Sequence, residues 1–465
     1  MESDKQPNGE NCRVFIFDRD RTQVLLVDDE DSCFVLPSVE IPRWERVADN
    51  LTAAVRNKWN CGAISLFAPE VPRLGNASNG HRYQVMECWC SDESPRSKTI
   101  WTSTRALTRQ AFRDSADYEV LEQCLREFDL YAGDPASPFA KSGWFTELQS
   151  WIADVIRPMG LRLSGPFRQL NGSPSFSLIR FETNGSAVWF KAVGKPNLHE
   201  FPITLALGTH LPGWVAPILA SRAPWNGWLA LGVDGTELGG SHDAHDWRMA
   251  ASALGMLQTE SALKVGALRD AGARDLSTTS LLKLVDPFFE AIEQLLEHQM
   301  STTVLFLKDA LLLREQVRRA LFRFGDLGIP DALGHLDLNP GNVIVCGEHC
   351  VFLDWAEAYV GHPFFSFQYL CEHFRRVPQV MDAAGAQLAD AYTQHWRSWV
   401  PSENITQALA LARMLAVFVY AAAMNGWRVE TTLQEPQIGR HLLSLVRRMK
   451  REANELRSQA TVGGK

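Results

Sequence analysis

The sequence predicts an α+β protein with a strand-rich N-terminal part and a mainly helical C-terminal part. Short apolar runs separated by turn residues recur up to about residue 235, which is typical of β-strands. After residue 244, apolar residues follow the spacing of amphipathic helices, interrupted by one hairpin. A stretch rich in Pro, Gly, Ser and Ala at residues 131–143 marks the clearest domain boundary in the 465-residue chain.

The composition, with 46% hydrophobic and 22% charged residues, is ordinary for a soluble globular protein. The net charge of -8 argues against non-specific binding to nucleic acid, which requires a basic face. The most apolar segment, residues 414–424, is too short to span a bilayer and predicts a buried helix. Nine cysteines without a C-x-x-C pair fit a reducing compartment. We therefore expect a cytoplasmic protein that binds neither nucleic acid nor a membrane.

The N-terminal part has the pattern of a small sheet with two helices. A hairpin turns at Arg19–Arg21, and a third short strand follows it. The run from Val47 to Lys58 has apolar residues at helical spacing. The predicted elements are strands at 13–18, 23–29, 33–37, 63–67 and 83–89, and helices at 47–58 and 114–128.

After the boundary, the sequence predicts a helix, a hairpin, a second helix and another strand. Asn184–Gly185 lies between two apolar runs and is a strong hairpin signal. The predicted elements are a helix at 143–156, strands at 176–182 and 186–193, a helix at 198–210 and a strand at 228–233.

A second hairpin interrupts the helical part, and polar residues stand at its ends. Its strands are the apolar runs 343–345 and 351–353. If the turn is centred on Glu348, Asn342 lies opposite Asp354 with Cβ atoms about 5 Å apart. Amide and carboxylate oxygens are hard ligands that suit Mg²⁺ carried on a phosphate-bearing substrate. The hairpin therefore predicts Asn342 and Asp354 as metal ligands.

The residues before this hairpin complete a known pattern. His335, Asp337 and Asn342 form H-x-D-x4-N, and the pattern followed by Asp354 matches the phosphoryl-transfer template. That template needs an aspartate to orient and deprotonate the acceptor hydroxyl, which is the role predicted for Asp337.

A phosphotransferase of this kind also needs a lysine on a strand. Lys191 ends the strand after the first hairpin turn, and apolar residues flank it. Glu200 on the next helix is the candidate partner of Lys191, and the alternative is that Glu200 caps its helix behind Asn197. Ser173 and Ser175 lie in the preceding loop, which offers backbone N–H groups and hydroxyls to phosphates although it has no G-x-G-x-x-G.

The segment HLDLNPGN, followed by FLDWAEAYVGHP, resembles the aminoglycoside phosphotransferase family, and the resemblance covers residues 141–460. It implies a bilobal protein-kinase-like fold, with an N-lobe at 141–235 and a mainly helical C-lobe at 236–465 that holds the catalytic hairpin. It also implies ATP or another nucleoside triphosphate as the phosphate donor, Mg²⁺ as the cofactor and a small molecule with a hydroxyl group as the acceptor.

The resemblance also assigns roles to single residues. The implied roles are catalytic base for Asp337, magnesium ligand for Asn342 and Asp354, phosphate contact for Lys191 paired with Glu200, structural support for His335, and adenine-binding backbone from Leu229 to Val233. After the metal-binding aspartate, the family's Gly-Asp-Pro is here Gly361-His362-Pro363, and a customary aspartate is replaced near Ser366. These positions usually brace the catalytic loop, so the departures bear on the substrate more than on phosphoryl transfer.

Residues 1–135 resemble a Nudix domain in layout, with a hairpin, FVLP, a helix containing AAVR, and Gly62. Nudix hydrolases hold Mg²⁺ with glutamates on that helix, but here Asn57 follows Arg56 and no pair of glutamates comes after it. An amide cannot assemble a multi-carboxylate metal site. The resemblance therefore implies a non-hydrolytic, Nudix-like α/β domain for docking, self-association or ligand sensing.

These observations predict an ATP- and Mg²⁺-dependent phosphotransferase that acts on a hydroxyl of a small molecule. Two alternatives are a nucleotide-binding regulatory protein without turnover and a pyrophosphate hydrolase that uses the first domain. The last helix, GRHLLSLVRRMKREANELR, carries six Lys and Arg residues against two Glu residues. Such charge runs are usually solvated faces, and this one does not have the acidity that a polycationic aminoglycoside needs. The sequence leaves open the acceptor, the choice of ATP or GTP, and the oligomeric state.

Overall fold

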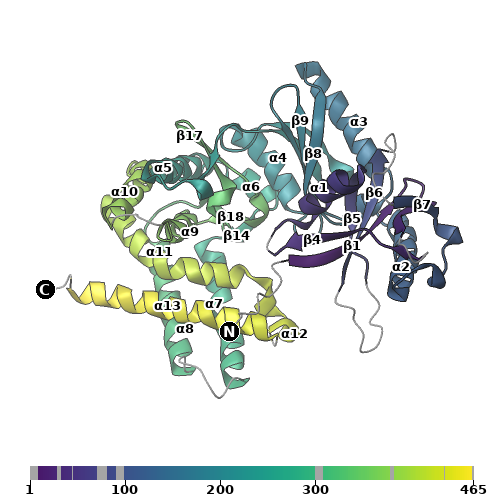
Figure 1. Ribbon diagram of the computed structural model, residues 1–465. Coiled ribbons are helices and arrows are strands. Elements are labelled where there is room, and N and C mark those ends of the chain that lie inside the picture. The colour runs from purple at the N-terminus through teal and green to yellow at the C-terminus, as the bar shows by residue number, and fades with distance from the viewer. Residues whose placement is uncertain are drawn as a thin grey trace, which may run out of the picture. The chain divides into compact units, whose positions relative to one another are not determined.

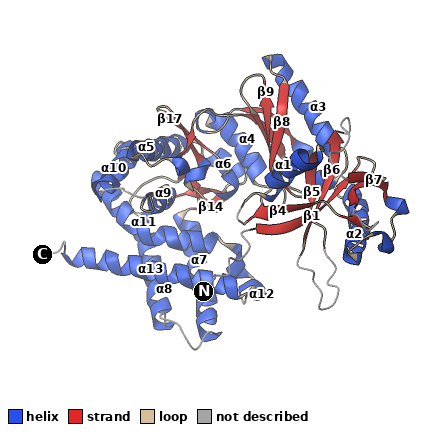
Figure 2. Cartoon of the chain, in the orientation of Figure 1, coloured by secondary structure: helices blue, strands red, loops and turns tan. Residues whose placement is uncertain are grey.

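The computed structural model describes residues 9–28, 33–43, 45–70, 81–90, 99–298, 307–377, 382–433 and 435–462 (Figures 1 and 2). Contacts divide the chain into two compact units. Unit 1 comprises Met1–Phe201 and Pro217–Gly232, and unit 2 comprises Pro202–Ala216 and Val233–Lys465. Both units contain helices and strands, so the predicted α+β class is confirmed.

The first sheet of unit 1 has seven strands in the order β3-β2-β1-β6-β5, with β4 paired to β1 and β7 paired to β2. Strands β1 and β6 run parallel, and the other pairs are antiparallel. The elements are β1 (Gly9–Phe17), β2 (Gln23–Asp28), β3 (Phe34–Val35), β4 (Ser38–Pro42), β5 (Gly62–Phe67), β6 (Arg82–Cys90), β7 (Thr99–Ser103), α1 (Val47–Trp59) and α2 (Ser115–Gly133).

The second sheet of unit 1 has five antiparallel strands in the order β11-β12-β10-β9-β8. Helix α3 precedes it in the chain. The elements are α3 (Trp144–Ile156), β8 (Leu163–Gly172), β9 (Ser177–Thr183), β10 (Val188–Ala192), β11 (Ile218–Arg222) and β12 (Gly227–Leu231).

One hydrophobic core joins the two sheets of unit 1. The ring of Trp89 on β6 lies 5.7 Å from that of Phe145 and 5.8 Å from that of Phe167. Gln169 on β8 is fully buried and binds the backbone of β5, because Ser65 N donates to its Oε1 at 2.8 Å and its Nε2 donates to Ser65 O at 2.9 Å. Further core residues are Phe15, Phe17, Phe67 and Val85 from the first sheet and Phe181, Phe190 and Leu229 from the second.

The Pro- and Gly-rich segment 131–143 packs into this core. It contains the 3₁₀ turn Pro138–Ala140, in which Phe139 is 1% exposed. The ring of Phe139 meets that of Trp225 edge-on with centroids 5.7 Å apart, and its backbone N–H donates to Pro174 O at 3.0 Å. The segment therefore connects α2 to the second sheet through buried contacts.

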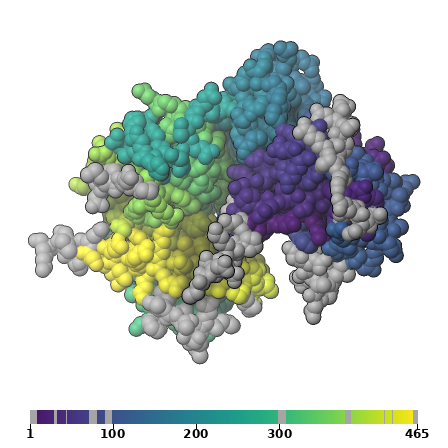
Figure 3. Space-filling view, viewed as in Figure 1, coloured from purple at the N-terminus to yellow at the C-terminus, as the bar shows by residue number. Residues whose placement is uncertain are grey.

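Unit 2 is mainly helical around two three-stranded sheets, in the orders β13-β16-β17 and β14-β18-β15. Helix α11 packs against both α9 and α13, and α13 exposes one face to solvent (yellow in Figure 3). The strands are β13 (Thr236–Glu237), β14 (Arg274–Leu276), β15 (Ala332–His335), β16 (Val343–Cys346), β17 (His349–Phe352) and β18 (Ala358–Gly361). The helices are α4 (Glu200–His210, which begins in unit 1), α5 (Ala244–Ser261), α6 (Val265–Asp270), α7 (Thr278–His298), α8 (Leu307–Gly325), α9 (Phe364–Phe374), α10 (Asp382–Thr393), α11 (Ser402–Ala423), α12 (Glu430–Leu433) and α13 (Pro436–Val462).

Helix α11 contains the apolar segment singled out in the sequence. Of the described helices, it alone is long and apolar enough to cross a membrane, and 61% of its most apolar window is buried inside the protein. Its buried residues belong to the core of unit 2, as the sequence pattern predicts for a buried helix.

The sequence pattern missed several short strands, of which β8 is the longest. Gly165 and Pro166 interrupt its apolar pattern and are breaker signals. The strand tolerates both residues because its pairing with β9 shifts register between Leu163 and Phe167. Proline fits a strand at such an irregularity, where its missing N–H costs no ladder hydrogen bond.

Candidate active site

The candidate catalytic loop follows β15 and ends where β16 begins. Asn339 shapes it, because its Oδ1 accepts a hydrogen bond from Gly341 N at 3.0 Å and closes the 3₁₀ turn Pro340–Asn342. The side-chain Nδ2 of Asn342 donates to Asp337 O at 2.9 Å. The loop is therefore held by its own side chains.

His335 braces this loop from below the surface. It is 1% exposed, its Nδ1 accepts from Asp337 N at 3.1 Å, and its Nε2 lies 3.1 Å from Leu353 O. Burial lowers the pKa of His335, so the ring is neutral and donates through Nε2. The same histidine therefore joins the loop of Asp337 to the strand end that leads to Asp354.

Ser366 at the start of α9 supports the other side of His335. Its Oγ accepts a hydrogen bond from His335 N at 2.8 Å and lies 3.1 Å from the hydroxyl of Tyr359. This is the position near which the resemblance leads one to expect an aspartate. A hydroxyl thus takes part in bracing β15, the strand before the candidate catalytic loop.

The hairpin register differs by one residue from the prediction. Cys346 pairs with His349 and Val343 pairs with Phe352, so Asn342 stands opposite Leu353 rather than opposite Asp354. The turn is a two-residue loop whose first residue, Gly347, has φ of 60°, as in type II′ turns. The expectation of a turn centred on Glu348 was therefore wrong, because glycine at the first turn position makes a shorter loop.

Asp354 nevertheless lies near the loop because the backbone turns there. Its φ of 62° and ψ of 67° are left-handed, a conformation that aspartate tolerates better than most residues. The negative charges of Asp354 and Asp337 both act on His335. Asp354 is exposed to solvent, which leaves its carboxylate accessible to a ligand.

A hard cation fits the donors offered by Asn342 and Asp354. Because the Nδ2 of Asn342 is engaged by Asp337 O, its Oδ1 remains to face a ligand, and no described residue donates to it. Among the described residues, no group of three His, Cys, Asp or Glu side chains could hold a metal by itself. A cation at this position would therefore take further ligands from phosphate oxygens or water, as Mg²⁺ commonly does.

Two tyrosines that sequence reasoning missed lie beside Asp337. Tyr369 on α9 donates to Asp337 Oδ1 at 3.4 Å, and its ring lies 6.1 Å from that of Tyr420 on α11. Burial, together with the charge of Asp337, raises the pKa of Tyr369 to about 12. The same two causes also raise the pKa of Tyr420 above its ordinary value. Both hydroxyls therefore stay protonated and can donate hydrogen bonds.

Unit 1 contains the other predicted polar pair. Lys191 Nζ on β10 lies 2.5 Å from Glu200 Oε1 at the start of α4, and the Glu200 side chain is 2% exposed. The Lys191 ammonium also lies 5.8 Å from the centre of the Trp228 ring, a cation–π geometry. The structure therefore brings the predicted partners Lys191 and Glu200 together.

The remaining predicted residues have mixed surroundings. The hydroxyl of Ser173 accepts a hydrogen bond from Phe176 N at 3.1 Å, so it closes its own loop. Ser175 packs closely against Gly194, where a Cβ would come within 2.5 Å of its hydroxyl. Leu229 is fully buried in a strand paired on both sides, whereas Val233 is half-buried where the chain passes into unit 2.

Comparison with known proteins bears on unit 2. Residues 232–401 match the model of a family described as "Phosphotransferase enzyme family", and this stretch includes Asp337, Asn342 and Asp354. These residues form a phosphotransferase-family domain. No curated protein sequence matches the chain.

Several solved structures resemble the chain that carries this phosphotransferase-family domain. A choline kinase from Cryptosporidium parvum Iowa II has a TM-score of 0.46 at 14% identity, covering 68% of this chain and 97% of its own. An ethanolamine kinase from Plasmodium vivax has a TM-score of 0.44 at 13% identity, covering 72% and 95%. A spectinomycin phosphotransferase in complex with ADP and spectinomycin has a TM-score of 0.40 at 10% identity, covering 66% and 98%. The assignment rests on the matched stretch and on the geometry of the site.

Proposed function

We propose that this protein is an ATP- and Mg²⁺-dependent phosphotransferase that transfers the γ-phosphate to a hydroxyl of a small molecule. One observation carries the proposal. The loop that holds Asp337 and Asn342 is fixed by hydrogen bonds between its backbone and the side chains of Asn339, Asn342 and His335, inside the stretch that matches a phosphotransferase family. Rigid placement of this kind suits phosphoryl transfer, in which catalysis is mainly positioning and charge neutralisation.

Asp337 is the proposed catalytic base. Its Oδ1 accepts the hydrogen bond from Tyr369, which leaves Oδ2 to accept the proton of the acceptor hydroxyl. The hydroxyl oxygen forms a bond to the γ-phosphorus, the bond to the β–γ bridging oxygen breaks, and ADP leaves. His335 keeps the loop in place as a neutral, buried ring and takes no proton.

The proposed nucleotide contacts are a cation, a lysine and backbone groups. Mg²⁺ held by Asn342 and Asp354 would neutralise charge on the nucleotide phosphates. Lys191, oriented by Glu200, would add a second positive charge. Backbone groups near Val233 would bind adenine, while Leu229 supports this segment from the core. The loop of Ser173 and Ser175 would supply backbone N–H groups, since the Ser173 hydroxyl is engaged within the loop.

The arrangement implied by these roles is a bilobal, kinase-like one, with the N-lobe in unit 1. For the first 135 residues we propose a non-hydrolytic Nudix-like domain whose main contribution is structural. Support comes from the shared core of unit 1 and from Asn57, an amide where hydrolysis needs a carboxylate. We also propose a cytoplasmic location, since the nine cysteines of the sequence include no C-x-x-C pair.

The test is ADP release from ATP and Mg²⁺ across a panel of hydroxyl compounds, for the full chain and for Asp337→Asn. We expect the variant to lose about 10²- to 10⁴-fold in turnover, the usual share of a general base, while nucleotide binding by calorimetry is unchanged. Asp326→Asn, an exposed aspartate on the loop before β15, is the matched control and should behave like the wild type.

Two further results separate catalysis from binding. Asp354→Ala should abolish the gain in ATP affinity that Mg²⁺ provides, because it removes a proposed ligand of the cation. A wild-type protein that binds ATP and Mg²⁺ but turns over no member of the panel would favour the regulatory alternative. Undiminished turnover in Asp337→Asn would refute the assignment of the base.

A further inference from the structure

A cavity of about 210 Å³ opens beside Asp337 within unit 2. Leu336, the neighbour of the catalytic aspartate, lines it together with Tyr369 and Tyr420. Because the hydroxyl of Tyr369 donates to Asp337 Oδ1, a small molecule in this cavity would lie within reach of the proposed base. The cavity is therefore the candidate binding site for the phosphate acceptor.

The charged side chains that line this cavity are mostly cationic. Arg376 follows α9, Arg413 lies on α11 and Arg448 lies on α13. Among the described residues that line the cavity, Glu372 is the single carboxylate. Three guanidinium groups thus face one carboxylate.

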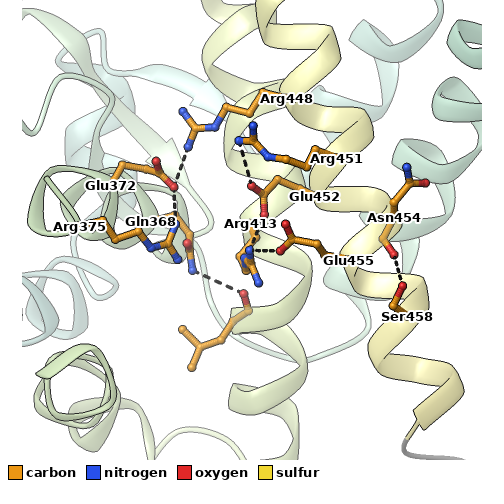
Figure 4. A network of polar contacts seen from close by, with 11 residues as sticks. Gln368, Glu372, Arg375, Arg413, Arg448, Arg451, Glu452, Asn454, Glu455 and Ser458 are labelled. Carbon is orange, nitrogen blue, oxygen red and sulfur yellow. Dashed lines mark hydrogen bonds and ion pairs between the residues drawn. The ribbon is translucent and has the colours of Figure 1, made fainter. Parts of the chain in front are cut away.

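Glu372 is already engaged by two arginines. Its Oε1 accepts from Arg375 Nη1 at 2.6 Å and from Arg448 Nη2 at 2.8 Å, and Figure 4 shows it between them. A cationic acceptor would have to displace these guanidinium groups to reach the carboxylate. Arg448 still has donors to offer, because a guanidinium carries five N–H groups and Glu372 takes only one of them.

Arg413 on α11 is held by two carboxylates of α13. Its Nη2 lies 2.8 Å from Glu452 Oε2 and 2.5 Å from Glu455 Oε2, both on α13. Arg451 also approaches Glu452, at 3.7 Å. The network and the cavity wall together hold five guanidinium groups, those of Arg375, Arg376, Arg413, Arg448 and Arg451, against three carboxylates.

Arg376 carries the excess positive charge at the cavity. It is exposed and forms no ion pair with any described residue. The positive charge of Arg376 acts on the cavity wall at His373. The pKa of His373 is lowered by burial first and by the charge of Arg376 second. The His373 ring lies 5.1 Å from the ring of Tyr369. An anionic group entering the cavity would meet a guanidinium that is not committed to another described residue.

We propose that the acceptor is a hydroxyl compound that carries an anionic group, a carboxylate or a phosphate, bound by Arg376 and Arg448 with its hydroxyl directed to Asp337. This inference rests on the proposed function and specifies its substrate class. Arginine suits the task, because its planar fork pairs with two oxygens of a carboxylate or phosphate. Cationic acceptors such as choline or a polycationic aminoglycoside would be repelled by the same groups.

The experiment measures binding without turnover. The full chain is saturated with a non-hydrolysable ATP analogue and Mg²⁺, so that the nucleotide site is filled, and titrated with succinate, inorganic phosphate, choline or kanamycin. We expect both anions to bind with a Kd on the order of 1 mM, and neither cation to bind at up to about 50 mM. Binding of choline or kanamycin without binding of the anions would overturn the proposal, and so would the failure of both anions to bind.

Variants identify the site. Arg376→Gln should weaken anion binding about 10- to 100-fold, because a charge-assisted hydrogen-bonded pair is lost, and Arg376→Lys should restore part of it. Arg376→Gln is preferred to a change at Arg448, which also holds Glu372. The matched control is Arg447→Gln, an exposed arginine on α13 that does not line the cavity. Equal anion affinity in Arg376→Gln and the wild type would place the anion elsewhere and refute the assignment.

The two proposals can fail separately. If the protein turns over ATP in an Asp337-dependent way but accepts cationic hydroxyl compounds, the inference about the acceptor is wrong and the proposed function stands. If the anions bind through Arg376 but the wild-type protein turns over no hydroxyl compound of the panel, the proposed function is wrong and the cavity is an anion site of another kind.

Discussion

At the scale of single residues, burial fixes the protonation state of His362, which directly follows β18. His362 is 2% exposed, and its ring stacks on Phe324 with centroids 3.7 Å apart. Its Nδ1 accepts a hydrogen bond from Phe364 N at 3.3 Å. Burial lowers the pKa of His362 to about 3, so this ring stays neutral wherever the protein is folded.

The depressed pKa of His362 predicts a loss of stability in acid. Below about pH 6.5 the unfolded chain binds a proton at this residue that the folded protein does not, and the effect continues down to about pH 3. The free energy of unfolding should therefore fall by about 1.4 kcal/mol per pH unit from this residue alone. Between about pH 6.5 and pH 5, the stability advantage of the wild type over His362→Asn should shrink by about 2 kcal/mol in urea titrations.

The control for this measurement is His242→Asn, which changes an exposed histidine in the same unit. Because this side chain is exposed, the substitution should change the free energy of unfolding by no more than about 0.5 kcal/mol. A pH-independent difference for His362→Asn would mean that the folded protein protonates this ring as readily as the unfolded chain does, which would contradict the prediction.

At the residue scale, the sequence was informative where chemistry restricts the choice of side chain. His335, Asp337 and Asn342 are close in sequence, so their spacing alone suggested a common loop, and they do share one. Tyr369 and Tyr420 come to Asp337 from separate helices, and nothing in an aromatic residue on a buried helix distinguishes a site residue from a core residue. Their role became apparent only from packing.

At the scale of elements, α9 carries on one face a residue that braces His335 and residues that line the cavity. Ser366, Tyr369 and His373 are spaced three and four residues apart, which places them on the same side of a helix. Ser366 braces His335, while Tyr369 and His373 line the cavity. This spacing directly after the catalytic hairpin is a signal that sequence reasoning could have used.

The edge between β5 and β8 supports a prediction about stability. Gln169→Leu would leave the buried N–H and C=O of Ser65 without their partners, and each loss costs about 1–3 kcal/mol. We expect a loss of about 2–4 kcal/mol in the free energy of unfolding, measured by urea denaturation. Gln123→Ala, a partly exposed amide on α2 of the same unit, should cost less than about 1 kcal/mol. Similar costs for both variants would show that the Gln169 contacts add nothing specific.

Strand registers were the least predictable part of the elements. The hairpin of β16 and β17 was recognised from its apolar runs, but its turn was misplaced by one residue because Gly347 permits a two-residue loop. Strand β8 was missed because Gly165 and Pro166 hide its pattern. Such details depend on backbone conformations that composition does not reveal.

At the scale of the whole molecule, the segment 131–143 is the point at which sequence and structure diverge most. Its composition is that of a linker, yet Phe139 and Ala140 are almost fully buried. Proline and glycine predict turns, but whether a turn is exposed depends on neighbours that are distant in sequence, here Trp225 and Pro174.

Burial of this segment predicts resistance to proteolysis. In the native protein, proteinase K should cleave between residues 137 and 143 at least about 100-fold more slowly than in the urea-unfolded chain, because cleavage requires the buried residues around Phe139 to open. Mass spectrometry of the fragments is the measurement. Phe139→Ala should accelerate cleavage there, since it removes a buried aromatic ring. Rapid release of a stable fragment ending near residue 135 would contradict the shared core.

The common core of unit 1 limits where this chain can be divided when domains are exchanged between genes. A domain that packs only against itself can be lost, duplicated or exchanged between genes without harm to its neighbour. Here the first 135 residues cover Phe167 of the second sheet through Trp89 and supply the backbone partner of Gln169. Any chimaera that divides the chain near residue 135 must replace that cover. The natural unit of exchange is therefore unit 1 as a whole, which ends at Gly232. The stretch Pro202–Ala216 lies within these residues in sequence but belongs to unit 2.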